Sequence, residues 1–115
     1  MSDTTDRELL ELAAKAAGIR LGWIGDTSFD CTKLKAGKPT YKGALWRPLT
    51  DDGDALRLAA ELRLVVKPGK HPGDGCSVES QQAGITSCTV FRDDPAEQMR
   101  RAIVMVAAEI GKAML

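Results

Sequence analysis

Apolar residues recur every three or four positions in three stretches of the chain, a spacing typical of amphipathic helices. The first stretch lies between Thr5-Asp6-Arg7-Glu8, which has the form of a helix-capping box, and Gly18, a helix-ending residue. The second runs from about Asp52 to Leu62, and the third from Pro95 to about Met114, directly after Asp94. Aspartate before a helix and proline in its first turn are start signals, so the pattern predicts three helices.

The second and third helices are predicted to bury different shares of their surfaces. In the second helix, Leu56 and Ala60 flank the inward stripe, so we expect this helix to be largely covered. Val104 and Met105 flank the stripe of the third helix and leave a homodimer through this helix as an open alternative. We expect the third helix to have an inner stripe of Met99, Ile103, Val106, Ile110 and Met114 and an outer face of Arg100, Arg101, Glu109 and Lys112.

Alternation of apolar and polar residues predicts strands between the helices. Ile24 follows the first alternation and is expected to end it. The predicted strands span residues 19–23, 63–67, 77–81 and 85–91, with a hairpin turn at 82–84. The order is helix, strand, loop, helix, three strands and helix (α-β-loop-α-β-β-β-α). It predicts a single α+β domain over residues 1–115, with three helices packed on one face of a short antiparallel sheet.

Residues 25–42 are polar and have no stable period, so we expect a long polar loop or a loose hairpin there. Such a segment is uncommon in a compact domain unless it binds something, although a mobile insertion without a role fits equally well. The arginine pair of the third helix forms a second cationic group, for which a solvated helix face is the alternative. The candidate partner-binding residues are therefore Lys33, Lys35, Lys38, Tyr41, Lys42, Arg47, Arg100 and Arg101.

The charge balance limits the classes of partner. Among 115 residues, Lys plus Arg and Asp plus Glu number 16 each, which gives no formal net charge. Proteins that bind phosphates unspecifically usually carry a positive excess, so nucleic-acid and membrane binding are disfavoured. Aromatic residues make up 4% of the chain, which leaves few rings for base stacking. No apolar run approaches the roughly 20 residues of a membrane span, and an acidic start lacks the order of a signal peptide, so we expect a cytoplasmic protein.

Candidate metal and catalytic residues are few. His71, Cys31, Cys76 and Cys88 supply four nitrogen or sulfur ligands, the number that a structural zinc site needs. No Cys-x-x-Cys pair is present, and the spacing favours one core cysteine in a strand and two loop thiols. A thiol nucleophile with His71 as its base matches no local catalytic pattern. The glycine-rich run 67–75 lacks the order of a phosphate-binding loop.

Three carboxylates, Asp51, Asp52 and Asp54, form the densest acidic group. Oxygen ligands of this kind suit a divalent cation, but the spacing of a calcium loop with a closing glutamate is absent. Carboxylates at a helix start also accept hydrogen bonds from unpaired amides, and we favour that capping role. We expect no metal, no cofactor and no catalytic residue, and an enzyme is less expected than a binding protein.

Three motifs together resemble a group of small uncharacterised proteins encoded by tailed bacteriophages and prophages. They are Asp6–Gly18, the run Trp46-x-Pro48-Leu49-x-Asp51 through Ala59, and Asp94-Pro95 followed by Arg100-Arg101-Ala102-Ile103-Val104. The resemblance covers the three helices, around half of the chain. It implies an accessory protein in the infected bacterial cytoplasm that binds a host or defence protein, and it implies no catalytic residue.

A small nucleic-acid-binding module is the alternative function. The stretch 33–47 gathers basic residues, and the order from the second to the third helix is that of double-stranded RNA-binding domains. That likeness is one of fold order only, and the neutral charge opposes it. The sequence therefore favours a protein partner from the host or the phage over nucleic acid.

Overall fold

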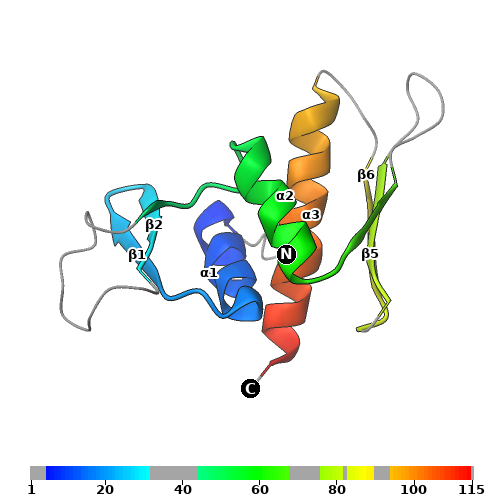
Figure 1. The fold of residues 1–115 in the computed structure, drawn as a ribbon, viewed down its shortest axis with the longest axis horizontal. Coiled ribbons are helices and arrows are strands. Elements are labelled where there is room, and N and C mark those ends of the chain that lie inside the picture. The colour runs from blue at the N-terminus through cyan, green and yellow to red at the C-terminus, as the bar shows by residue number, and fades with distance from the viewer. Residues whose placement is uncertain (1–4, 32–43, 68–75, 82, 90–93, 115) are drawn as a thin grey trace.

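A computed structural model describes residues 5–31, 44–67, 76–81, 83–89 and 94–114. These residues form three helices and six strands (Figure 1). In chain order they are α1 (Asp6–Ala17), β1 (Leu21–Ile24), β2 (Thr27–Asp30), β3 (Ala44–Leu45), α2 (Asp52–Glu61), β4 (Val65–Lys67), β5 (Cys76–Ser80), β6 (Ile85–Thr89) and α3 (Pro95–Ala113). The predicted α+β class and the three predicted helices are confirmed.

Each helix starts on the capping residue that the sequence indicates. The Thr5 hydroxyl accepts a hydrogen bond from the Glu8 amide at the start of α1. The Asp51 carboxylate does the same for the Asp54 amide of α2, and Asp94 accepts from the first amides of α3. These side chains satisfy amides that have no partner inside the helix, which is why the starts were predictable.

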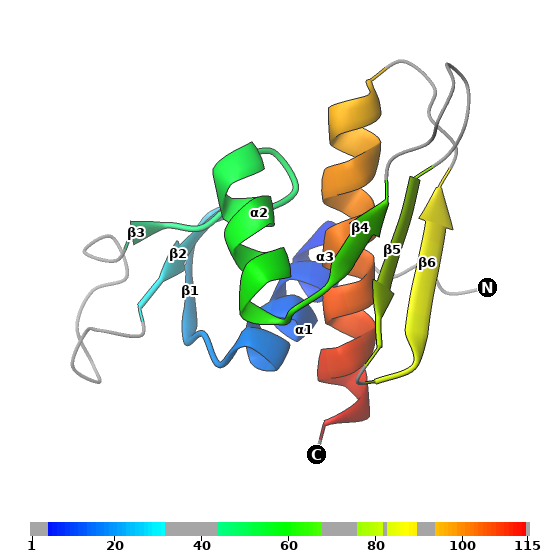
Figure 2. The ribbon, with the colours of Figure 1, turned by 45° about the vertical axis from the view of Figure 1, so that its right-hand side comes forward.

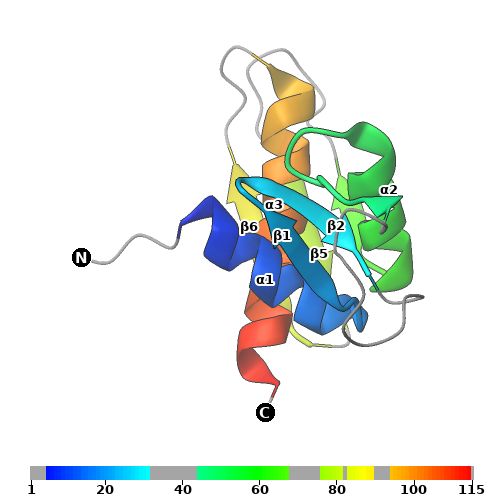
Figure 3. The same ribbon diagram turned by 90° about the vertical axis from the view of Figure 1, so that its left-hand side faces the viewer.

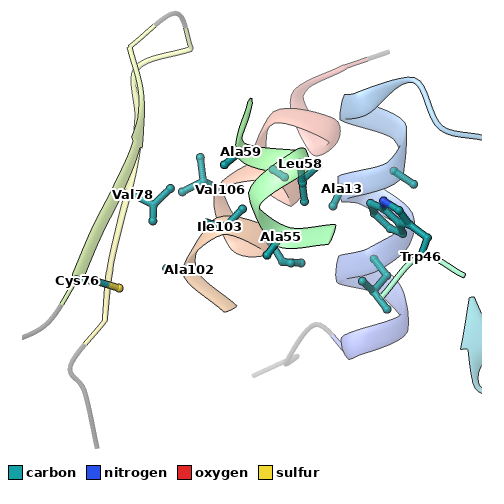
Figure 4. Close-up of a cluster of buried hydrophobic side chains, with 14 residues drawn as sticks. Ala13, Trp46, Ala55, Leu58, Ala59, Cys76, Val78, Ala102, Ile103 and Val106 are labelled. Atoms are coloured by element: carbon teal, nitrogen blue, oxygen red, sulfur yellow. The ribbon is translucent and has the colours of Figure 1, made fainter. Parts of the chain in front are cut away.

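The long helix α3 lies between α1 and the C-terminal strands (Figure 2). The α1 and α3 backbones approach closely at Gly111, where an added Cβ atom would lie 1.9 Å from the Leu12 carbonyl oxygen. The buried core gathers side chains from all three helices and from β5 (Figure 4). In that view Val78 points from β5 toward Val106 of α3, and Trp46 lies beside Ala13 of α1. Helix α3 thus packs against α1 and α2 on one side and against β5 and β6 on the other.

The strands form two antiparallel sheets of three strands each, rather than the single sheet expected. We call β1-β2-β3 sheet A and β4-β5-β6 sheet B. The helices lie between them (Figure 2), so α3 packs on sheet B while sheet A lies on the side of α1 and α2. The sequence pattern predicted strands without showing that the helices would separate them into two groups.

Sheet A contains a hairpin whose second strand lies inside the segment predicted to be a long polar loop or a loose hairpin. Ile24 extends β1 instead of ending it and pairs with Thr27 of β2 across a two-residue turn. Gly25 takes the first turn position with a φ of +59°, where a glycine is favoured because it has no Cβ atom. Within the predicted segment 25–42, residues 27–30 are therefore strand, and residues 32–42 lie outside the described part of the chain.

Three predicted burial patterns are wrong. Leu56 of α2 is 68% exposed because α2 packs against α3 and leaves its far side to solvent. Val104 of α3 is fully buried, so it cannot serve as a dimer flank, while Met105 is exposed. Met114 is also exposed beyond the last turn of α3. A helix packed between α1 and sheet B buries more than one stripe, which explains the burial of Val104.

Candidate functional site

Sheet A turns an apolar face away from the core. Side chains of paired residues share a face, so Gly22, Phe29 and Leu45 lie in one row and Ile24 lies on the same side. Ile24 is 45% exposed and Leu45 is 50% exposed, Thr27 lies on the same side, and the exposed Arg20 follows the same alternation one pair beyond Gly22, at the end of this face. Figure 3 views the molecule with this hairpin toward the reader. We call the surface of Ile24, Phe29 and Leu45 the outer face of sheet A.

The opposite side of sheet A faces the helices. Leu21 and Trp23 pack against the buried core, and Ser28 is buried with its hydroxyl donating to the Trp46 carbonyl. The amide of Trp46 donates to the Ser28 carbonyl and continues the ladder past β3. The inner side of the sheet is thus anchored by hydrogen bonds and by Trp46.

A cleft of about 350 Å³ opens between α1, the β1–β2 turn and the segment before α2. We call it the Trp23 cleft. Its floor is apolar and consists of Leu10, Trp23 and Leu49, while Ser28 and Thr50 also contribute. Charged residues of both signs line it as well, namely Asp6, Arg7, Asp26 and Arg47.

The Arg7 guanidinium lies 4.4 Å from the centroid of the Trp23 ring, a cation–π arrangement. Its Nε atom is also 3.3 Å from Glu11 Oε1, one turn further along α1. Arg7 and Trp23 line a second hollow of about 530 Å³, together with Lys15, Ile19 and other residues of α1 and β1. The Arg7–Trp23 pair therefore borders two hollows between α1 and sheet A.

Asp54 fixes the segment that carries Arg47. Its buried carboxylate accepts a hydrogen bond from the Arg47 amide at 2.8 Å and another from Arg57 Nη2 at 2.6 Å. The hydrogen bond and the negative charge of Asp54 raise the pKa of Arg57. Asp51 caps the same helix, so these carboxylates serve the start of α2 as the sequence analysis favoured.

The predicted partner-binding residues separate into three groups. Arg47 lines the Trp23 cleft. Arg101 Nη2 lies 3.1 Å from Oδ1 of Asp6, and Asp6 lines the same cleft. Arg100 is not on a solvated face: its side chain is 15% exposed, because it donates to the Leu49 carbonyl and pairs with Asp52. The remaining residues, Lys33, Lys35, Lys38, Tyr41 and Lys42, lie outside the described part of the chain.

The structure does not bring the candidate zinc ligands together. Cys31 is buried at the end of β2 in sheet A, and Cys76 is buried at the start of β5 in sheet B, on the other side of the helices. His71 and the side chain of Cys88 lie outside what the structure describes. The expectation of two loop thiols is wrong, because Cys31 and Cys76 are both buried: the Cys31 amide bonds to the Arg20 carbonyl just past β2, and Cys76 begins β5. The described residues hold no cluster of His, Cys, Asp or Glu suited to a metal ion.

Sequence reasoning missed the outer face of sheet A and most of the cleft. The available signal was the alternation on both sides of Gly25-Asp26, which is a hairpin pattern with Ile24 and Phe29 on one face. In the part of the chain that the structure covers, no helix combines the length and apolarity needed to cross a membrane. Comparison of the chain with models of protein families, with curated proteins and with solved structures gave no match in any of the three.

Proposed function

We propose that this chain is a protein-binding accessory protein and that the outer face of sheet A contacts its partner. The single observation behind this proposal is the exposure of Ile24 and Leu45 beside Phe29 on one sheet face, with the charged Arg20 only at its end. An apolar centre depleted of charge is the composition that distinguishes the middle of protein interfaces. The phage resemblance adds a host or defence protein of the bacterial cytoplasm as the proposed partner.

The geometry favours a protein over nucleic acid. A nucleic-acid surface needs cationic side chains available for phosphates. Arg100 and Arg101 are both paired with carboxylates, and Asp6 and Asp26 lie beside Arg47 in the Trp23 cleft. Of the basic stretch 33–47, Arg47 is the one cationic residue within the described ranges. The nucleic-acid alternative therefore depends on lysines outside those ranges.

The test compares the two sheets of the same molecule. Leu45→Glu places a charge on the outer face of sheet A, and Thr86→Glu places the same charge on an exposed position of sheet B. Tagged wild type and both variants are used to capture proteins from a bacterial lysate, with and without nuclease. We expect Leu45→Glu to lose a nuclease-resistant partner that the wild type and Thr86→Glu both retain.

A photoactivatable phenylalanine at position 45 or position 86 provides the second measurement. We expect a covalent adduct with the captured protein from position 45 and none from position 86. Equal capture by both charge variants, together with equal labelling from both positions, would contradict the proposal. Loss of capture after nuclease treatment would favour the nucleic-acid alternative instead.

A further inference from the structure

The Trp23 cleft contains two opposite charges that are not used within the described chain. Asp26 and Arg47 both line it, and neither side chain forms an ion pair among the described residues. The other two charges are engaged, because Asp6 pairs with Arg101 and Arg7 contacts Glu11 and the Trp23 ring. The cleft therefore offers one carboxylate and one guanidinium around an apolar floor.

We propose that the Trp23 cleft binds a short peptide segment of a partner protein, with a bulky apolar side chain between a basic and an acidic group. The apolar side chain fills the space above Leu10, Trp23 and Leu49. The basic group pairs with Asp26 and the acidic group pairs with Arg47. This inference rests on the proposed function only in taking a protein as the partner, since it concerns a separate surface.

The size and composition of the cleft select this occupant. A volume of about 350 Å³ is at the lower end of the range for small-ligand pockets, about 300–1,000 Å³, so it suits one large side chain and its neighbours. The lining carries two carboxylates and two guanidinium groups, so it has no positive excess to attract a phosphate backbone. A simple ion would make no favourable contact with the apolar floor, whereas an apolar side chain is stabilised there by burial from water.

Both charges are carried by segments that the fold holds in place. The Asp54 carboxylate binds the Arg47 amide, so Arg47 starts from a fixed backbone position. Asp26 occupies the two-residue turn between β1 and β2, whose ladder pairs Ile24 with Thr27. Because the backbone of both residues is held, binding costs only the freedom of the two side chains, which favours their use in recognition.

The experiment measures binding of fluorescein-labelled pentapeptides by fluorescence polarisation. The probes are Gly-Lys-Phe-Glu-Gly, its reversed-charge form Gly-Glu-Phe-Lys-Gly, the uncharged Gly-Gln-Phe-Gln-Gly, and Gly-Lys-Ala-Glu-Gly, which lacks the bulky side chain. A labelled thymidine oligonucleotide serves as the nucleic-acid probe. We expect one of the two charged phenylalanine peptides to bind about tenfold more tightly than its reversed-charge form and than the uncharged and alanine peptides.

A charge-exchanged variant tests which residues set this preference. Asp26→Lys combined with Arg47→Asp keeps one positive and one negative charge at these positions while exchanging their signs, and both side chains are exposed. We expect this variant to prefer the charged peptide that the wild type rejects. The outer-face variant Leu45→Glu is expected to keep the wild-type preference, so failure of this inference is distinguishable from failure of the proposed function.

Three outcomes with the wild-type protein would overturn the inference. They are equal binding of all four peptides, no measurable binding of either charged phenylalanine peptide, and tighter binding of the oligonucleotide than of the peptides. An unchanged peptide preference in the charge-exchanged variant would also overturn it, because the rim charges would then not contact the peptide. Circular dichroism of each variant confirms that the fold is retained before binding is measured.

Discussion

Sheets A and B have three strands each but differ in what they present to solvent. Sheet B buries Cys76, Val78 and Ser80 on one face of β5, while Ser77 and Glu79 alternate with them on the outer face, paired with Lys67 and Val65 of β4. The outer face of sheet A instead carries Ile24, Phe29 and Leu45. Sheet B follows the usual alternation for an antiparallel sheet with one solvated face. Sheet A departs from it, which indicates a surface suited to being covered.

The two sheets also differ in their attachment to the helices. Sheet B packs directly on α3, with β5 and β6 both in contact with that helix. Sheet A is tied to the helices through Trp46 and the Arg47–Asp54 hydrogen bond, and two hollows border its inner side at Trp23. We infer that sheet B contributes more to stability and sheet A more to recognition.

The largest expected effect tests this division directly. Val78→Asp places a charge on the inner face of sheet B at a fully buried position. A buried unpaired charge costs several kcal/mol, which is comparable to the whole stability of a small domain, so we expect the variant to be unfolded. Ile24→Asp makes the same kind of change on the outer face of sheet A, where we expect a cooperative fold to remain. Thermal unfolding followed by circular dichroism distinguishes the two.

If both variants melted like the wild type, Val78 would not be a core residue. If both were unfolded, the outer face of sheet A would be as necessary to the fold as the inner face of sheet B. Either result would remove the distinction between a structural sheet and a recognition sheet.

The three helices could be predicted from the sequence because their start signals and apolar periods are local. Thr5, Asp51 and Asp94 cap the helices, and the apolar period then identifies each one without reference to distant residues. The division of strands into two sheets was not predictable, because it depends on α1 packing against α3. The predicted burial of Leu56 and the predicted exposure of Val104 were wrong for the same reason, because neighbouring elements, not periodicity, decide which flank of a stripe is covered.

The candidate site was less accessible to sequence reasoning than the fold. Arg47 was selected as a cationic residue, but its place in a cleft beside Asp26 arises from the hairpin turn and from Asp54. Arg100 was selected for its charge, yet its guanidinium serves the Leu49 carbonyl and Asp52. Charge alone indicates that a side chain needs a partner, and only the tertiary structure shows whether that partner lies within the chain.

A smaller effect is expected from the hydrogen bond that ties sheet A to α2. Asp54→Ala removes the acceptor of the Arg47 amide and the partner of Arg57. Hydrogen bonds to a charged group contribute about 1.5–3 kcal/mol, so we expect the free energy of unfolding to fall by about 1–3 kcal/mol. The control Glu11→Ala removes an exposed ion pair with Arg7 and is expected to change it by less than about 0.5 kcal/mol. Urea denaturation measures both, and equal losses would show that Asp54 does not anchor this segment.

The smallest effect concerns two residues with a positive φ, one just before sheet B and one in the β1–β2 turn of sheet A. Arg63, between α2 and β4, has a φ of +54°, while the Arg63 and Leu64 amides bond to the Ala60 and Ala59 carbonyls at the end of α2. A left-handed conformation costs a residue with a Cβ atom about 1–2 kcal/mol, and a glycine variant avoids this cost. Part of the gain is lost, because glycine also gives the unfolded chain more conformational entropy. We therefore expect Arg63→Gly to raise the free energy of unfolding by about 0.5 kcal/mol. Sheet A already has glycine at its turn, so Gly25→Ala should lower it by about 1 kcal/mol. Urea midpoints test both changes, and a loss of stability in Arg63→Gly would mean that the arginine side chain makes a contact that outweighs its backbone strain.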